Sequence, residues 1–148
     1  MENNAVEKLN TMLKGEYMAI DAYDRFIRDV RDENIQNEFL KIQEDHKKHI
    51  EELKGRVRSL GGRPVESTGI VGFMANTMLA AENIINRDSL SILKKAYDGE
   101  DKGIGMSEKV VVSDLDNESK NMVEQILSDD HDHLKRMAVL ISNFESKH

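Results

Sequence analysis

Apolar residues recur along this chain at alternating intervals of three and four, and this spacing strongly limits what the chain can fold into. Such spacing puts apolar side chains on one narrow stripe of a helix, as in the helices of a bundle. It predicts a first helix from about Val6 to Arg31, with Glu16 at a stripe position that calls for an apolar group. The stripe consists of Leu9, Leu13, Ile20, Tyr23, Ile27 and Val30.

Three more long helices of the same kind follow. Their predicted N-caps are Asp32, then Asp88 or Ser89, then Asp116. Gly61-Gly62 ends the second helix. The stripes of these helices consist of Ile35, Phe39, Ile42, His46, His49, Leu53 and Leu60, of Leu90, Leu93, Tyr97, Glu100, Ile104 and Val111, and of Val123, Ile126, Asp130, His133, Met137, Leu140 and Phe144.

The second and third helices are joined by a long crossover. It contains an apolar segment from Ile70 to about Asn86, which we interpret as a short extra helix. That segment packs either within the same chain or against a second subunit, and the second alternative would give a homodimer.

Composition places the chain among helix-rich soluble domains. Its 148 residues suit one domain, residues 1–148, and it is 39% apolar and 33% charged, with one proline. A net charge of -7 argues against a nucleic-acid partner. The absence of cysteine excludes thiolate zinc sites, iron–sulfur centres and a cysteine nucleophile. No apolar run approaches the roughly 20 residues that span a membrane, and no secretory signal is evident, so we expect a cytoplasmic protein.

The two halves of the chain resemble each other at an offset of 84 residues. The offset pairs caps with caps, apolar stripe residues with apolar stripe residues, and polar stripe residues with polar ones. Identical pairs include Leu9 and Leu93, Glu16 and Glu100, Asp32 and Asp116, Ile42 and Ile126, Asp45 and Asp129, and His49 and His133. Two related helical hairpins therefore form an up-down four-helix bundle.

Six polar stripe residues are predicted to meet at one level of this bundle. Glu16 lies 16 residues before Asp32, and His46 and His49 lie 14 and 17 residues after it. Glu100, Asp130 and His133 have the same spacing around Asp116. At 1.5 Å per residue, every one of these positions lies roughly 24 Å from its turn. Gly99, Gly103 and Gly105 indicate a close helix contact or a local irregularity near Glu100.

A buried layer of this kind predicts a metal site. Three buried carboxylates are costly without a cation, and no lysine or arginine lies on the stripes at this level. Carboxylates with imidazoles suit iron, manganese, zinc, nickel or copper better than calcium or magnesium. The alternative is a metal-free polar layer.

Asp45 and Asp129 each precede a stripe histidine by four residues. They either orient the outer nitrogen of that ring or are solvated charges, and the second account is the simpler one.

The pattern resembles the ferritin-like superfamily, which includes bacterioferritin and rubrerythrin. Its di-iron sites take a glutamate from each of two helices and Glu-x-x-His from each of the other two. Glu16 and Glu100 match the single glutamates, and His49 and His133 match the histidines. His46 replaces one bridging glutamate, and Asp130 is a shortened version of the other.

The resemblance implies a metal-binding protein with one or two ions per chain, iron being favoured over zinc or manganese. It implies iron oxidation or the reduction of oxygen or peroxide, with electrons from iron itself or from an external donor protein. Two alternatives remain open: a non-enzymatic bundle that binds metal for structure or storage, and a metal-free interaction module that uses Ile70–Asn86 as its interface.

Overall fold

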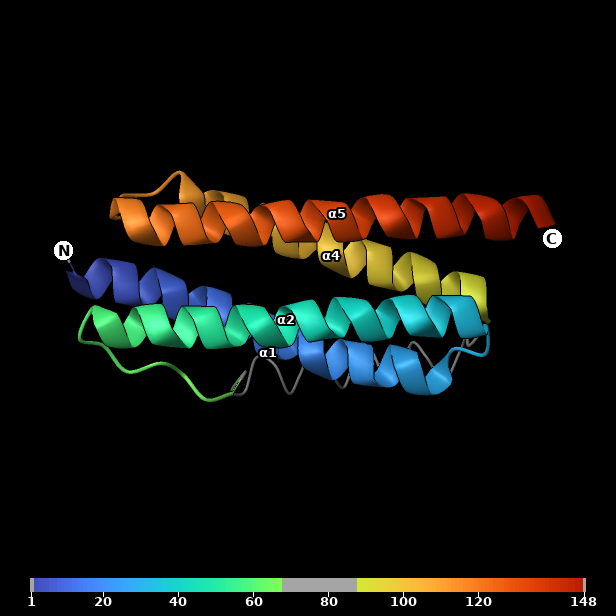
Figure 1. Ribbon diagram of the computed structural model, residues 1–148, viewed down its shortest axis with the longest axis horizontal. Coiled ribbons are helices and arrows are strands. Elements are labelled where there is room, and N and C mark those ends of the chain that lie inside the picture. The colour runs from blue at the N-terminus through green and yellow to red at the C-terminus, as the bar shows by residue number, and fades with distance from the viewer. Residues whose placement is uncertain (1, 68–87, 148) are drawn as a thin grey trace.

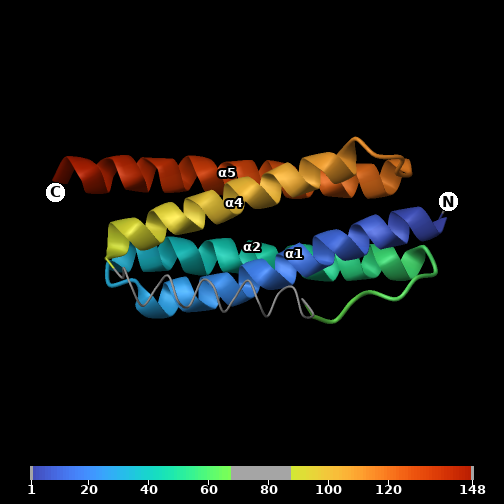
Figure 2. The ribbon, with the colours of Figure 1, turned by 180° about the vertical axis from the view of Figure 1, so that it is seen from behind.

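The computed structural model describes residues 2–67 and 88–147. Within these ranges it contains four long helices and no strand: α1 (Glu2–Asp29), α2 (Glu33–Ser59), α4 (Ser89–Val111) and α5 (Asn117–Lys147). The helices lie side by side, with α1 antiparallel to α2 and α4 antiparallel to α5 (Figures 1 and 2). The predicted all-α four-helix bundle is therefore confirmed.

The two hairpins meet along two pairs of helices, α1 with α4 and α2 with α5. Because α2 and α4 run in the same direction, the end of α2 and the start of α4 lie at opposite ends of the bundle (Figure 2). This explains why their connection is long. The predicted extra helix at Ile70–Asn86, and the homodimer contact assigned to it, lie outside the described residues. No helix of the described part is long and apolar enough to cross a membrane.

Short polar caps set where the helices begin. Asp32 accepts a hydrogen bond from the backbone N–H of Ile35 at 3.0 Å, and Asp88 accepts one from Ser91 at 2.9 Å. Asp116 accepts one from Ser119 at 3.0 Å. All three predicted caps are confirmed. The first helix is longer at its start than predicted, beginning at Glu2 rather than Val6.

The end of α2 is fixed by glycine and by an ion-pair network. Gly61 has a φ of 82°, in the left-handed region that favours glycine. At Gly62 a Cβ atom would lie 2.6 Å from Cγ1 of Val6, so a larger residue there would clash with α1. One turn earlier, Arg56 donates to Asp116 and to Glu118 at 2.8 Å each, which joins α2 to the start of α5.

The buried interior consists of two apolar clusters separated by a polar layer. One cluster surrounds Leu13, Leu53 and Ile126, and the other surrounds Phe39, Leu93 and Met137. Along every helix the polar stripe residues stand between members of the two clusters. The fold therefore holds a layer of ionisable groups away from both ends of the bundle, where water would otherwise reach it.

Candidate metal centre

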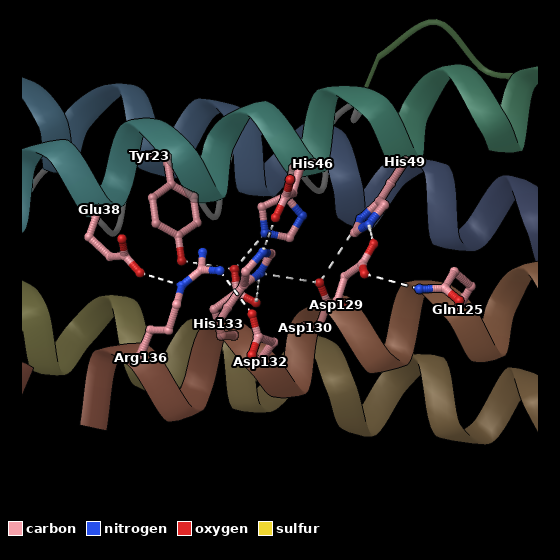
Figure 3. Close-up of polar contacts among 12 residues, drawn as sticks. Tyr23, Glu38, His46, His49, Gln125, Asp129, Asp130, Asp132, His133 and Arg136 are labelled. Atoms are coloured by element: carbon pink, nitrogen blue, oxygen red, sulfur yellow. Dashed lines mark hydrogen bonds and ion pairs between the residues drawn. The ribbon is translucent and has the colours of Figure 1, made fainter. Parts of the chain in front are cut away.

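The polar layer is built from one residue each of α1 and α4 and two each of α2 and α5. Each of the six side chains belongs to a residue no more than 6% exposed. The structure brings together all six of the residues that the sequence placed at one level: Glu16, His46, His49, Glu100, Asp130 and His133. Figure 3 shows His46 and His49 pointing from α2 toward Asp130 and His133 of α5.

His46 lies between the two glutamates. Its Nδ1 is 2.7 Å from Oε2 of Glu16, and its Nε2 is 2.5 Å from Oε1 of Glu100. An ionised carboxylate can only accept hydrogen bonds, so both ring nitrogens donate and the ring is an imidazolium when no metal is bound. Burial opposes the charged ring, but Glu100 and Glu16 outweigh it and hold the pKa of His46 well above its usual value.

The outer nitrogens of His49 and His133 are bound by aspartates on the opposite hairpin. Nε2 of His49 is 2.8 Å from Oδ2 of Asp129, and Nε2 of His133 is 2.7 Å from Oδ2 of Asp45. The predicted role of these aspartates as partners of an outer ring nitrogen is therefore confirmed, but the histidine assigned to each one was wrong, and the simpler account of solvated charges was wrong too. Each ring extends across the contact between α2 and α5, so it meets the aspartate of the facing helix instead.

This pairing turns Nδ1 of both rings into the polar layer. Nδ1 of His49 lies 3.5 Å from Oε2 of Glu16, and Nδ1 of His133 lies 3.3 Å from Oε2 of Glu100. Oδ1 of Asp130 lies 4.0 Å from the first of these nitrogens and 3.5 Å from the second. The layer thus brings nitrogen and oxygen atoms from all four helices close together inside the bundle.

Two of these inward-facing atoms have no hydrogen-bond partner. Within the described part of the chain, Nδ1 of His49 and Oδ1 of Asp130 are the buried side-chain atoms left unpaired. Leaving a buried polar atom without a partner costs about 1–3 kcal/mol. Both atoms are good ligands for a transition-metal ion. The residues present therefore fit a metal ion, on the basis of their unpaired atoms and of their ligand chemistry.

The histidines neutralise much of the layer in the absence of metal. Burial alone would raise the pKa of Glu16 and of Glu100, but neighbouring histidines lower both. Burial would lower the pKa of His49, yet the negative charge of the nearby Glu16 carboxylate raises that pKa to about 9. The expectation that these carboxylates need a divalent cation, because no lysine or arginine is at hand, therefore overlooked the imidazolium ions.

Asp130 differs from the other two carboxylates. Burial, followed by the charge on Glu100, raises its pKa to about 7, although His46 partly opposes the effect. In the metal-free protein at neutral pH, the Asp130 carboxyl is consequently protonated for a large part of the time. A cation beside Oδ1 would favour the ionised form.

Tyr23 is a member of the layer that the stripe pattern did not reveal. Its place in the apolar stripe predicts a packing residue, but its hydroxyl donates to Oε1 of Glu100 at 2.8 Å. The ring also stacks on His46, with centroids 5.7 Å apart. Burial, with the charge on Glu100, raises the pKa of Tyr23 well above its usual value, so the phenol remains a proton donor.

A hollow of about 590 Å³ between α1 and α4 leads to the polar layer. Its inner lining includes Glu16, His46, Glu100 and Asp130. Small residues on both helices create the space: Gly15, Ala19, Ala22, Ala96, Gly99 and Gly103. Among the described residues, a Cβ atom at Gly99 or Gly103 would have nothing within 4 Å. These glycines therefore leave space beside the layer and make no close contact with the described helices, which was one of the two alternatives that the sequence left open.

The fold is that of the ferritin-like four-helix bundles. A two-domain protein of Anabaena variabilis ATCC 29413, with DJ-1/ThiJ/PfpI-like and ferritin-like domains, matches with a TM-score of 0.82 and 18% identity. The match covers all of this chain but only 39% of that protein. The dodecameric thioferritin of Bacteroides fragilis, a bacterioferritin-related protein, matches with a TM-score of 0.81 and 17% identity over 99% of this chain and 89% of its own.

A ferritin-like, diiron-carboxylate protein of Bacillus anthracis strain Ames matches with a TM-score of 0.74 and 22% identity over 95% of this chain and 96% of its own. Curated protein sequences provide no significant match. The chain belongs to the family described as Domain of unknown function (DUF2383), whose sequence model matches residues 4–113.

Proposed function

We propose that this chain binds divalent transition-metal ions, iron above all, in the polar layer of its core. The observation that carries the proposal is the pair of unpaired buried atoms, Nδ1 of His49 and Oδ1 of Asp130, among four further ligand side chains. The similarity in fold to a diiron-carboxylate protein supports iron over zinc or manganese. One or two ions per chain are compatible with the number of ligands.

The carboxylates of the layer and Tyr23 have definite roles in this proposal, beside the three histidines that supply nitrogen ligands. Glu16 and Glu100 supply terminal carboxylates. Asp130 supplies a third carboxylate, whose Oδ1 lies 4.0 Å from Nδ1 of His49 and 3.5 Å from Nδ1 of His133. Tyr23 holds Oε1 of Glu100 in place.

The proposed activity is iron oxidation coupled to the reduction of oxygen or peroxide. Ferrous iron in the layer would supply the electrons for this reaction. The sequence contains no cysteine, so further electrons would come from iron itself or from an external donor protein. The hollow between α1 and α4 gives small oxidants a path to the buried layer.

Elemental analysis of protein purified without a histidine tag tests metal binding. We expect one or two iron ions per chain in the wild type and none in the Glu16→Ala/His133→Ala double variant. The matched control is His131→Ala, which removes an exposed histidine two residues from His133. Metal content at the wild-type level in the double variant, or no metal in the wild type after reconstitution with ferrous, manganous or zinc salts, would refute the proposal.

A non-enzymatic role in metal binding, structural or for storage, is the second candidate. The observation in its favour is that His46 stands where ferritin-like di-iron sites have a bridging glutamate. Adding ferrous iron to the metal-free protein in air separates the two candidates. A rapid rise in ferric absorbance that Glu16→Ala/His133→Ala lacks indicates an oxidoreductase, whereas bound iron without that rise indicates a binding role.

A further inference from the structure

His46 differs from the other two histidines of the layer because both of its ring nitrogens point at candidate ligands. Its Nδ1 faces Glu16 and its Nε2 faces Glu100, on opposite sides of the ring. His49 and His133 turn only Nδ1 inward, since Asp129 and Asp45 hold their Nε2 atoms. His46 is 3% exposed and has no ring nitrogen left for solvent.

The ligand atoms of the layer form two groups, and His46 belongs to both. In each group the atoms lie within 4.8 Å of one another. One group consists of Glu16, His46 and His49, and the other of His46, Glu100, Asp130 and His133. Within the described residues, no other side chain is shared between the groups.

We propose that His46 binds two divalent transition-metal ions at once, one through each ring nitrogen, so that an imidazolate joins the two halves of the centre. One ion is held with Glu16 and His49, and the other with Glu100, Asp130 and His133. The inference rests on the proposed metal binding and assigns its nuclearity and its linking residue. The position that holds a bridging glutamate in ferritin-like di-iron sites thus keeps a linking role with a different chemical group.

Charge balance supports this arrangement. Three carboxylates and one imidazolate carry four negative charges, which two divalent ions neutralise, whereas a neutral His46 would leave one positive charge buried. Metal ligands must be deprotonated, so binding releases protons. The two ring protons that His46 donates to Glu16 and Glu100 leave for solvent as the ions take their places, as do the inner protons of His49 and His133 and the proton of Asp130, and no electron is transferred.

The two ions of such a centre are not equivalent. The group around Glu100 offers two carboxylates and two nitrogens, whereas the group around Glu16 offers one carboxylate and two nitrogens. Greater negative charge favours cation binding, so the Glu100 group fills first. The imidazole ring also separates the ions, which leaves each of them a coordination sphere of its own.

Cadmium-113 provides a test that is independent of activity. The full chain is prepared metal-free with nitrogen-15 in its histidine rings and is then titrated with cadmium-113. Cadmium content per chain is measured alongside the nitrogen-15 spectrum, in which a ring nitrogen bound to cadmium is split. His46→Gln assigns the His46 signals, and His131→Gln is the control at an exposed histidine.

We expect two cadmium ions per wild-type chain, splitting of both His46 nitrogens, and splitting of one nitrogen each in His49 and His133. His46→Glu should keep two ions, because a carboxylate can also link them, whereas His46→Gln should lose at least one. Circular dichroism confirms that each variant is folded.

Two results would overturn the inference while leaving metal binding intact. These are a single cadmium per wild-type chain, and two cadmium ions with one or neither nitrogen of His46 split. A wild type that binds no cadmium, zinc or iron would instead overturn the proposed function together with the inference. If a variant fails to fold, the wild-type spectrum still decides the matter, because one ring with both nitrogens split is distinct from rings with a single split nitrogen.

Discussion

At the scale of single residues, the crossed pairs between aspartate and histidine determine which nitrogen faces the centre. Asp45 bonds His133 and Asp129 bonds His49, so each pair joins α2 to α5. The 84-residue offset relates the two pairs to each other. Gln125 donates to Asp129 at 3.2 Å, which adds a further support to one of them. The aspartates therefore position the rings and do not themselves enter the layer.

Replacing both aspartates should weaken metal binding without removing any ligand. Loss of a carboxylate behind a metal-binding histidine typically costs about 10–100-fold in affinity. We expect an Asp45→Asn/Asp129→Asn variant to lose affinity in that range, as measured by competition with a coloured chelator. Asp101→Asn, at an exposed position on α4, is the control. Unchanged affinity in the double variant would show that the rings hold their orientation without these partners.

The metal-free protein should lose stability as the pH rises from about 6.5 to 9. The Glu16 carboxylate outweighs the effect of burial and raises the pKa of His49 from 6.5 to about 9. A raised pKa in the folded state stabilises the protein fully below the pKa of the unfolded state, and this contribution is lost on passing the folded value. The shift corresponds to a loss on the order of 3 kcal/mol.

Thermal unfolding with a chelator present, measured at several pH values, checks this expectation. Asp130, with a pKa of about 7, adds to the decline at the lower end of the range. A His49→Gln variant should show a smaller decline between pH 7 and pH 9 than the wild type. A wild-type melting temperature that stays level or rises across that interval would contradict the assignment of the proton to His49.

Sequence spacing could predict which six residues share a level because helical rise is constant and the caps are readable. The same spacing could not predict the partners of Asp45 and Asp129. That pairing depends on how α2 and α5 face each other, which no pattern within one helix contains. Tyr23 was missed for a related reason: its position is apolar in the stripe, and its hydroxyl becomes a ligand support only once α1 meets α4.

At the scale of whole helices, α1 and α4 differ from α2 and α5 because glycine and alanine line the hollow between them. This hollow leads to the layer. Glycine within a helix costs roughly 1 kcal/mol relative to alanine. The glycines of α4 keep this space open despite their cost to the helix, which is consistent with a route for ions to the buried layer.

Filling the hollow should slow the entry of metal without changing how much is bound. Gly103→Met adds a flexible side chain where a Cβ meets nothing within 4 Å, so it should be accommodated. We expect metal uptake, followed by stopped-flow absorbance with cobalt, to slow several-fold while the final stoichiometry stays the same.

Gly105→Met is the matched control for this change. It makes the same substitution on the same helix, also into open space, at a residue that does not line the hollow. Both variants should gain roughly 1 kcal/mol from better helix propensity. Equal uptake rates in the two variants would show that ions enter by another route.

At the scale of the whole molecule, the two apolar clusters hold the bundle together, and the polar layer between them is largely neutralised by its own histidines. We therefore expect the fold to persist without metal, in contrast to small domains that unfold without it. The four-helix architecture could be predicted from the sequence because the stripes belong to the apolar clusters. The state of the layer could not, because it depends on which nitrogens carry protons.

Removing metal should lower the melting temperature and leave the helices intact. An ion present at 100 times its dissociation constant stabilises the folded state by about 2.7 kcal/mol. In a chain of this size that corresponds to a rise in melting temperature of roughly 10 °C. We expect this difference between iron-loaded and chelator-treated wild type under anaerobic conditions, with the same far-ultraviolet circular dichroism at 20 °C. The Glu16→Ala/His133→Ala variant should show no difference. Loss of helical signal on chelation would mean that the ion, and not the histidines, keeps the charged layer within the core.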